Sequence, residues 1–290
     1  MNESIKVINK QGVELDGHFY NANSKICILH IPGFGGTFEG LPQKIGEYIQ
    51  NNKMTYLCGL NQGSYPEYKF KQYNKNGSIT LKQGGGIYED FDDCILDIQA
   101  WLDFISANDF DKIYLLGHSM GCNKILHYLS IHECKNLCGL IFLAPQDFTN
   151  IVDNPIHKGM ILEAEKNLNL GLNSKLLTNK FLGFSPISSF TFANFKNNPH
   201  IHNFQYKNFN SNFDVLQKIN KPTFVIMGEK DQTFDDLQDK TLIPKYFENI
   251  AKKVNDFSFK IIPNARHTFK TTKTEVAKEI VDFITCSSKN

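Results

Sequence analysis

The sequence predicts an α/β protein with a mostly parallel central sheet and helices on both of its faces. Two observations lead to this fold class. Short apolar runs, typical of buried strands, alternate with helical patterns along most of the chain. An antiparallel hairpin comes before them, over residues 5–21 ("IKVINKQGVELDGHFYN"), with its turn at Gln11-Gly12. A hairpin followed by repeated strand–helix pairs is typical of a sheet covered on both faces.

The remaining elements are expected in a regular order. The next strands lie over the runs KICILHI, MTYLCGL, KIYLLG, LCGLIFLAP, PTFVIMG and FSFKIIP. Helices are expected over FEGLPQKIGEYIQNN, YEDFDDCILDIQAWLDFIS, CNKILHYLSIH, LIPKYFENIAKKV and TEVAKEIVDFIT. The second of these helices, residues 88–106, has apolar side chains at helical spacing and acids in its first turn, where the helix dipole favours them. Residues 61–86 are polar and interrupted by glycines, so a loop is expected there.

One segment, residues 146–213, interrupts this alternation. It has helical patterns over residues 156–172 and then becomes rich in Phe, Ser and Asn over residues 180–198. We therefore expect a small lid or cap inserted into a core made of residues 1–145 and 214–290. Its phenylalanines either fill the core of this subdomain or line a pocket for an apolar or aromatic substrate group.

The composition is that of an ordinary soluble enzyme-sized chain. At 290 residues it can bury one large core, and its formal net charge of +1 favours neither nucleic acid nor an anionic membrane as a partner. No apolar run reaches the length of a membrane span, and the first ten residues lack the apolar region of a secretory signal. A cytoplasmic protein is the expectation, and the oligomeric state is left open.

Seven cysteines are present, and reduced cysteines in a cytosolic core fit them better than a disulfide framework. Cys134 and Cys138, near His132, could be metal ligands. No second ligand pair with zinc-finger spacing exists, so no metal is expected.

Residues 113–125 ("IYLLGHSMGCNKI") contain the strongest chemical signal. They hold the pattern G-x-S-x-G, from Gly117 to Gly121, between an apolar strand and an amphipathic helix. In that context the pattern predicts a nucleophile elbow, a turn so tight that only glycine fits on either side of Ser119. The serine is then held in a strained conformation with its hydroxyl above the sheet. The alternative is a serine that only caps an ordinary helix.

With this motif the chain resembles an α/β-hydrolase, whose triad follows the order Ser, acid, His. In that family the acid comes just after a late strand and the histidine lies in the loop after the last strand. Here "TFVIMGEKDQTF" ends a late strand with Asp231, and "FKIIPNARHTF" has His267 after the last strand. The resemblance covers nearly the whole chain, except residues 61–86 and 146–213. It implies an α/β-hydrolase fold with a small lid or cap insertion.

The resemblance also implies roles for the three residues. Ser119 would attack an acyl carbon, His267 would take its proton, and Asp231 would fix the imidazole tautomer. Other carboxylates remain alternatives for the acid, namely Asp235, Asp236, Asp239 and the more distant Asp214.

The glycine-rich stretch "LHIPGFGGTFEG", residues 29–40, has two interpretations. A dinucleotide loop needs G-x-G-x-x-G, but Phe38 stands where the third glycine belongs, and the next strand ends without an acid. In α/β-hydrolases this loop reads H-G-x-G and supplies a backbone N–H to the oxyanion hole. Two residues separate His30 from Gly33 here, which puts the usual bracing role of that histidine in doubt. The expected oxyanion donors are the N–H groups of Phe34 and Met120.

Two more residues flank the elbow. His118 is interpreted as a packing and hydrogen-bonding residue rather than a second base. Cys122 is interpreted as a small buried filler rather than a nucleophile.

The function implied is that of a serine hydrolase that cleaves carboxylic esters of small molecules through an acyl-enzyme, with no metal and no cofactor. The aromatic insert favours a bulky or aromatic substrate group, with Phe184, Phe190 and Phe192 as the candidate substrate-binding residues. Two alternatives stay open because one fold hosts many functions. One is an acyltransferase or thioesterase of small-molecule metabolism with the same triad, and the other is a non-catalytic ligand receptor.

Overall fold

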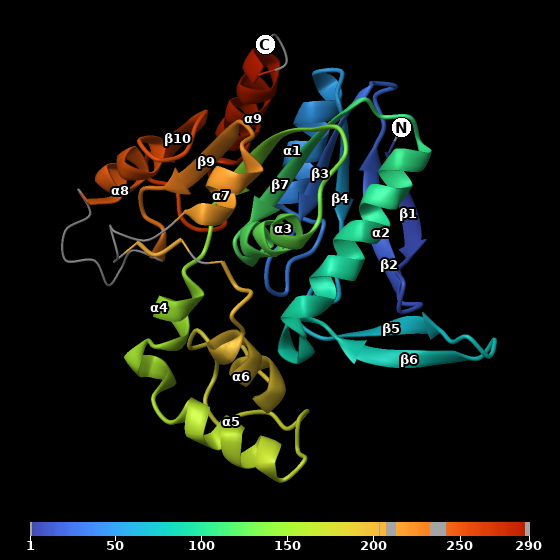
Figure 1. Cartoon of the computed structure of the whole chain (residues 1–290), viewed down its shortest axis with the longest axis vertical. Coiled ribbons are helices and arrows are strands. Elements are labelled where there is room, and N and C mark those ends of the chain that lie inside the picture. Colours follow the sequence, from blue (N-terminus) through green and yellow to red (C-terminus); the bar gives the residue numbers. More distant parts are fainter. Residues whose placement is uncertain (1, 203, 207–212, 233–241, 288–290) are drawn as a thin grey trace.

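A central sheet of eight strands forms the body of the protein (Figure 1). The computed structural model describes residues 2–202, 204–206, 213–232 and 242–287. The strand order is β1-β2-β4-β3-β7-β8-β9-β10. The bounds are β1 Asn2–Ile8, β2 Glu14–Tyr20, β3 Ile26–Ile31, β4 Thr55–Gly59, β7 Lys112–His118, β8 Leu137–Leu143, β9 Thr223–Gly228 and β10 Phe257–Ile262.

The pairing directions confirm the predicted fold class. β1 pairs with β2 and β2 with β4 in antiparallel fashion, whereas the pairs from β4 through β3, β7, β8 and β9 to β10 are all parallel. The carboxyl ends of these parallel strands therefore meet at one edge of the sheet, where ligand sites of α/β proteins form.

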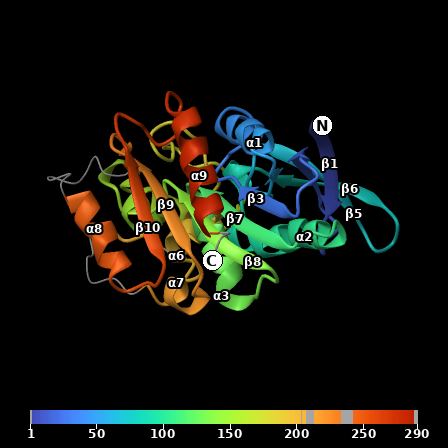
Figure 2. The ribbon, with the colours of Figure 1, turned by 90° about the horizontal axis from the view of Figure 1, so that it is seen from above.

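Helices cover both faces of the sheet (Figure 2). α1 (Leu41–Asn51) and α9 (Lys273–Ser287) pack together on one face. α2 (Cys94–Ala107), α3 (Met120–Ile131) and α7 (Asp214–Ile219) lie on the other. α8 (Leu242–Ala251) packs against β10 at the sheet edge. Within the described part of the chain, no helix is long and apolar enough to cross a membrane.

Trp101 shows how closely α2 packs on the sheet. Its side chain is fully buried, and its Nε1–H donates to the Leu60 carbonyl oxygen over 2.8 Å. A Cβ atom at Gly17 or Gly59 would come within 2.5 or 2.7 Å of the indole. The two glycines thus create the space that the indole ring fills, in keeping with the dense packing of protein cores.

The prediction of a loop over residues 61–86 is wrong for much of this segment. β5 (Tyr68–Tyr73) and β6 (Ile79–Gly84) form an antiparallel hairpin, a separate two-stranded sheet. The hairpin turns at Gly77, whose φ of 82° favours glycine. Because most hairpin side chains are exposed to solvent, its strands lack the apolar alternation by which strands are recognised.

The helix expected over residues 88–106 also begins later than predicted. Two short 3-10 turns, η1 (Gly86–Tyr88) and η2 (Phe91–Asp93), come first, and α2 starts at Cys94. The Asp90 side chain accepts a hydrogen bond from the Asp92 backbone N–H at the start of η2. This local bond stabilises a turn where periodicity alone predicted a continuous helix.

Residues 148–197, which follow β8, form a group of short helices beyond the carboxyl edge of the sheet (Figure 1). They are α4 (Phe148–Val152), η3 (Pro155–His157), α5 (Met160–Asn169) and α6 (Ser189–Asn197). This group has its own apolar cluster, which also includes Phe91 and Met120 from outside the insert. We refer to residues 146–213 as the insert.

Asp97, a fully buried carboxylate on α2, ties this helix to two loops. It accepts hydrogen bonds from Asn9 Nδ2 (2.7 Å), from the Gln62 backbone N–H (2.7 Å) and from Gln62 Nε2 (3.1 Å). Burial nevertheless raises the pKa of Asp97 to about 6, because desolvation of the charged form outweighs these bonds.

We expect the buried Asp97 to make stability depend on pH. A carboxyl group whose pKa is raised on folding stabilises the fold below its unfolded pKa, and this contribution is lost as pH rises through the folded value. The unfolding free energy of the wild type relative to Asp97→Asn should therefore fall by about 2 kcal/mol between about pH 4.5 and 7. Urea denaturation measures this difference. The exposed Asp103→Asn variant is the control. If the difference in unfolding free energy between the wild type and Asp97→Asn were as independent of pH as the difference between the wild type and Asp103→Asn, the prediction would be contradicted.

Candidate active site

The turn between β7 and α3 has the strained geometry of a nucleophile elbow. Ser119 stands there with φ 56° and ψ −126°, in a region that non-glycine residues rarely adopt. A Cβ atom at Gly117 would lie 2.6 Å from the Cys122 nitrogen, and one at Gly121 would lie 2.0 Å from the Ile31 carbonyl oxygen. Both flanking glycines are therefore required for the turn to close, as the G-x-S-x-G pattern predicted.

Two loops at the carboxyl edge bring an acid and a base to this turn. The loop after β9 carries Asp231 and the loop after β10 carries His267. Backbone bonds join the two loops, from Glu229 N to the Ile262 oxygen (3.0 Å) and from Lys230 N to the Ala265 oxygen (2.8 Å). Because β9 and β10 are parallel neighbours, these bonds fix the separation of the two side chains.

Ser119, His267 and Asp231 form a continuous hydrogen-bonded chain. His267 Nε2 lies 2.9 Å from Ser119 Oγ, and His267 Nδ1 lies 2.9 Å from Asp231 Oδ2. Asp231 is fully buried, whereas the His267 side chain is 18% exposed. A buried carboxylate on Nδ1 favours the tautomer that leaves Nε2 able to accept the serine proton.

The glycine-rich loop after β3 lies against the elbow. A Cβ atom at Gly33 would come within 2.9 Å of Ser119 Cβ and 3.0 Å of the Met120 nitrogen, so this close contact requires glycine. The N–H of Phe34 has no hydrogen-bond partner among the described residues. Met120 is the first residue of α3, where backbone N–H groups have no partner inside the helix. Met120, one predicted oxyanion donor, directly follows Ser119, and Phe34, the other, directly follows Gly33, which lies against Ser119.

A buried ionic network behind the elbow was not predicted from the sequence. Lys124 of α3 pairs with Glu89, and both side chains are almost wholly buried. Lys124 Nζ also donates to Asn61 Oδ1 (2.7 Å), and Asn61 Nδ2 donates to the Pro32 carbonyl oxygen (3.1 Å). The helix that begins at the elbow is therefore connected through polar side chains to the loop that carries Phe34.

The loop over residues 61–66 supports the glycine-rich loop directly. The N–H of Gly35 donates to the Gly63 oxygen (2.9 Å), and the N–H of Tyr65 donates to the Gly36 oxygen (3.0 Å). A Cβ atom at Gly63 would lie 2.1 Å from Glu89 Cδ. This glycine lets the buried carboxylate approach the backbone. The glycine is visible in the sequence, but its contact with Glu89 can be recognised only when the fold is known.

His30 is a core residue. Its side chain is fully buried and Nδ1 lies 2.5 Å from the Tyr56 hydroxyl, so it contacts the neighbouring strand β4. Burial holds the pKa of His30 well below its usual range, which keeps the imidazole neutral.

His118 and Cys122, the neighbours of the elbow, have structural contacts. His118 Nε2 lies 3.0 Å from the carbonyl oxygen of His267. Burial, with a smaller contribution from His267, lowers the pKa of His118 to about 4. Burial raises the pKa of the Cys122 thiol well above its usual value, so the reactive thiolate is disfavoured.

Aromatic side chains of the insert reach the site through Phe34. The Phe34 ring packs edge-on against Phe181 and Phe195, with centroids 5.5 and 6.1 Å away. The three rings named from the sequence lie differently. Phe192 is buried in the apolar cluster of the insert, Phe190 is half-buried, and Phe184 is 69% exposed.

The other candidates from the sequence can be located in the same way. The carboxylate within hydrogen-bond distance of His267 belongs to Asp231, and Asp214 begins α7. Asp235, Asp236 and Asp239 lie outside the described residues. In the described part of the chain, the side chains that converge as in a metal site are Asp92, His127 and His200, and not Cys134, Cys138 and His132.

The sheet topology and the elbow define an α/β-hydrolase fold, and comparisons with known proteins agree. The chain belongs to the family described as "Protein of unknown function (DUF1749)", whose model matches residues 85–287. A comparison with curated proteins found no match.

Several solved structures are similar to this chain. One is the esterase Pf2001 of Pyrococcus furiosus, with 15% identity, a TM-score of 0.61, and coverage of 98% of this chain and 90% of the esterase. Another is Est1E of Butyrivibrio proteoclasticus with ferulic acid bound, with 16% identity, a TM-score of 0.63, and coverage of 98% and 99%. A third is the α/β-hydrolase GrgF of Penicillium sp. sh18, with 16% identity, a TM-score of 0.65, and coverage of 98% and 97%. At these identities the likeness shows the fold.

We expect the Lys124–Glu89 pair to be strongly coupled. Lys124→Met leaves the Glu89 carboxylate buried without its counter-charge, which should lower the unfolding free energy by about 3–5 kcal/mol. In the double variant Lys124→Met/Glu89→Gln the loss should be well below the sum of the two single losses. Denaturant unfolding of the four proteins measures the coupling. Additive losses would contradict a direct interaction between the two side chains.

Proposed function

We propose that this chain is a serine hydrolase that cleaves carboxylic esters through an acyl-enzyme, with Ser119, His267 and Asp231 as its catalytic triad. One observation carries the proposal: a serine strained at φ 56° has its hydroxyl oxygen 2.9 Å from an imidazole whose other nitrogen bonds a buried carboxylate. The fold shared with esterases such as Pf2001 supports the reaction class.

Acylation would proceed from the serine hydroxyl. As Ser119 Oγ forms a bond to the ester carbonyl carbon, His267 Nε2 accepts the hydroxyl proton. The carbonyl oxygen becomes an oxyanion, which the N–H groups of Phe34 and Met120 stabilise. Removal of one such donor costs about 3 kcal/mol in well-studied hydrolases. Collapse of this intermediate breaks the bond to the alcohol oxygen, which takes the proton from His267 as it leaves.

Deacylation would repeat these steps with water. His267 accepts a proton from water as the water oxygen attacks the acyl carbon, and it returns this proton to Ser119 Oγ when the acid leaves. Asp231 remains ionised and stabilises the imidazolium formed in each half of the reaction.

The triad assignment predicts a specific pattern of loss. Ser119→Ala should abolish labelling by a fluorophosphonate probe and reduce hydrolysis of a p-nitrophenyl ester by at least about 10³-fold. Asp231→Asn should reduce kcat by about 10⁴-fold, because the amide favours the wrong tautomer of His267. Mass spectrometry of the labelled wild type locates the modified residue. A probe attached anywhere except Ser119, or turnover unchanged in Ser119→Ala, would refute the assignment.

Hydrolysis and acyl transfer are distinguished by their products. With a competing alcohol present, the proposed esterase should release mainly the free acid, whereas an acyltransferase would form mainly the new ester. The wild type and Ser119→Ala are compared under the same conditions, so that uncatalysed transfer is subtracted.

The rings around Phe34 support a bulky or aromatic substrate group. The Phe34 ring is partly buried and continues into the apolar cluster of the insert, so the oxyanion loop and an apolar surface are adjacent. Such a surface would bind a flat apolar group of the ester through burial and edge-to-face contacts.

Phe34→Ala tests this preference, because alanine keeps the backbone N–H and removes only the ring. We expect kcat/KM for an aryl ester to fall about 10-fold or more, since the lost ring contributes one or two kcal/mol of apolar contact. Hydrolysis of a small aliphatic ester, ethyl acetate, should change little. Phe184→Ala, which removes an exposed ring, is the comparison. If kcat/KM for the aryl ester fell only in Phe184→Ala, the substrate pocket would lie at Phe184. An equal fall in kcat/KM for both esters in Phe34→Ala would contradict the proposed preference.

A further inference from the structure

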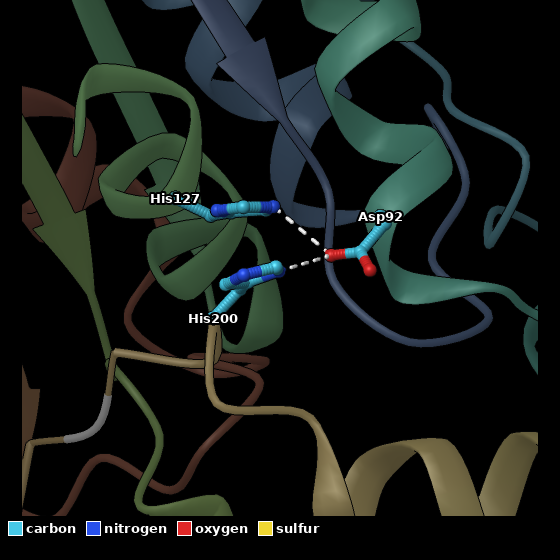
Figure 3. Close-up of side chains that lie close together, drawn as sticks. All are labelled: Asp92, His127 and His200. Atoms are coloured by element: carbon cyan, nitrogen blue, oxygen red, sulfur yellow. Dashed lines mark hydrogen bonds and ion pairs between the residues drawn. The ribbon is translucent and has the colours of Figure 1, made fainter. Parts of the chain in front are cut away.

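We propose that Asp92, His127 and His200 form a binding site for a divalent transition-metal cation such as Zn²⁺ (Figure 3). The three residues come from distant parts of the sequence: Asp92 from η2, His127 from α3, and His200 from the segment after α6. The site would connect the insert to the body of the protein. It is independent of the proposed hydrolase chemistry.

The donor atoms already converge. Asp92 Oδ1 lies 3.0 Å from His127 Nε2 and 3.2 Å from His200 Nδ1, and all three atoms lie within 4.8 Å of one another. A tetrahedral zinc ion with bonds of about 2.0–2.2 Å holds its ligand atoms about 3.3–3.5 Å apart. The two contacts with Asp92 are close to this spacing, so the main adjustment is an approach of the two nitrogens.

His200 can make that adjustment. The rings of His127 and His200 stack with centroids 4.9 Å apart and an angle of 13° between their planes. A cation lies close to the plane of each imidazole that binds it, so one ring has to turn. The His200 side chain is 55% exposed, whereas that of His127 is 4% exposed and stacks on Phe91. We therefore expect His127 to stay in place and His200 to rotate.

The surroundings fit a cation site open to solvent. Two imidazoles and one carboxylate are a donor set that suits zinc and similar ions. The Asn198 side chain hydrogen-bonds to the Asp92 carboxylate, which orients the ligand as outer residues do in metal sites. The Asp92 side chain is 46% exposed, which leaves an entry path.

The test uses the 290-residue chain after treatment with a chelator. Titration with Zn²⁺ against a chromophoric chelator should show one bound ion, and Zn²⁺ should raise the thermal unfolding midpoint. His200→Ala and Asp92→Asn should each weaken the affinity by about 10-fold or more and remove the stabilisation. His200 is an exposed side chain, so its variant should fold normally, which far-UV circular dichroism checks.

His132→Ala is the matched control. His132 lies exposed at the end of the same helix α3, beside Cys134 and Cys138. We expect this variant to bind Zn²⁺ like the wild type. The Co²⁺ complex of the wild type should show d–d absorption without a thiolate charge-transfer band. Unchanged affinity in His200→Ala, loss of binding in His132→Ala, or a thiolate band would each overturn the proposed site.

Discussion

The candidate site depends on one close contact, that between the loop after β3 and the sharp turn after β7. The backbones at Gly33 and Gly121 approach so closely that a Cβ atom at either position would overlap the other loop. This approach places Gly33, the residue before Phe34, against the strained Ser119. A strained residue persists only where its surroundings over-determine it, and here two fully buried parallel strands hold both loops.

The buried ionic network of Lys124, Glu89 and Asn61 also connects the glycine-rich loop to α3. Burial of Lys124 and Glu89 is costly unless the pair is well satisfied, since charged groups lose their hydration in the protein interior. Desolvation raises the pKa of Glu89, and the charge of Lys124 opposes that shift. The pair receives additional support from Asn61, which also bonds the loop at Pro32. Polar contacts thus connect α3 continuously to the glycine-rich loop.

The insert is joined to the body of the protein at two places of different chemistry. On one side Phe181 and Phe195 pack on Phe34, within an apolar cluster that also contains Met120. On the other side, His200 stacks on His127 and contacts Asp92 through polar atoms. A shift of the insert would therefore change the apolar surroundings of the Phe34 ring.

Apolar runs and glycine spacing along the chain predicted the parallel sheet and the elbow at Ser119, and the resemblance to α/β-hydrolases pointed to the loops that carry Asp231 and His267. The sheet and the elbow were predictable because each segment carries its own local pattern, whereas the acid and the histidine were assigned by their place in the order of elements of the resembling family. Three other features became visible only in the folded protein: the hairpin over residues 68–84, the Lys124–Glu89 pair, and the contacts of the insert rings with Phe34. These contacts join residues that have no local sequence pattern in common. They stabilise the protein only after the fold has brought the partners together, so they could not be predicted from the sequence.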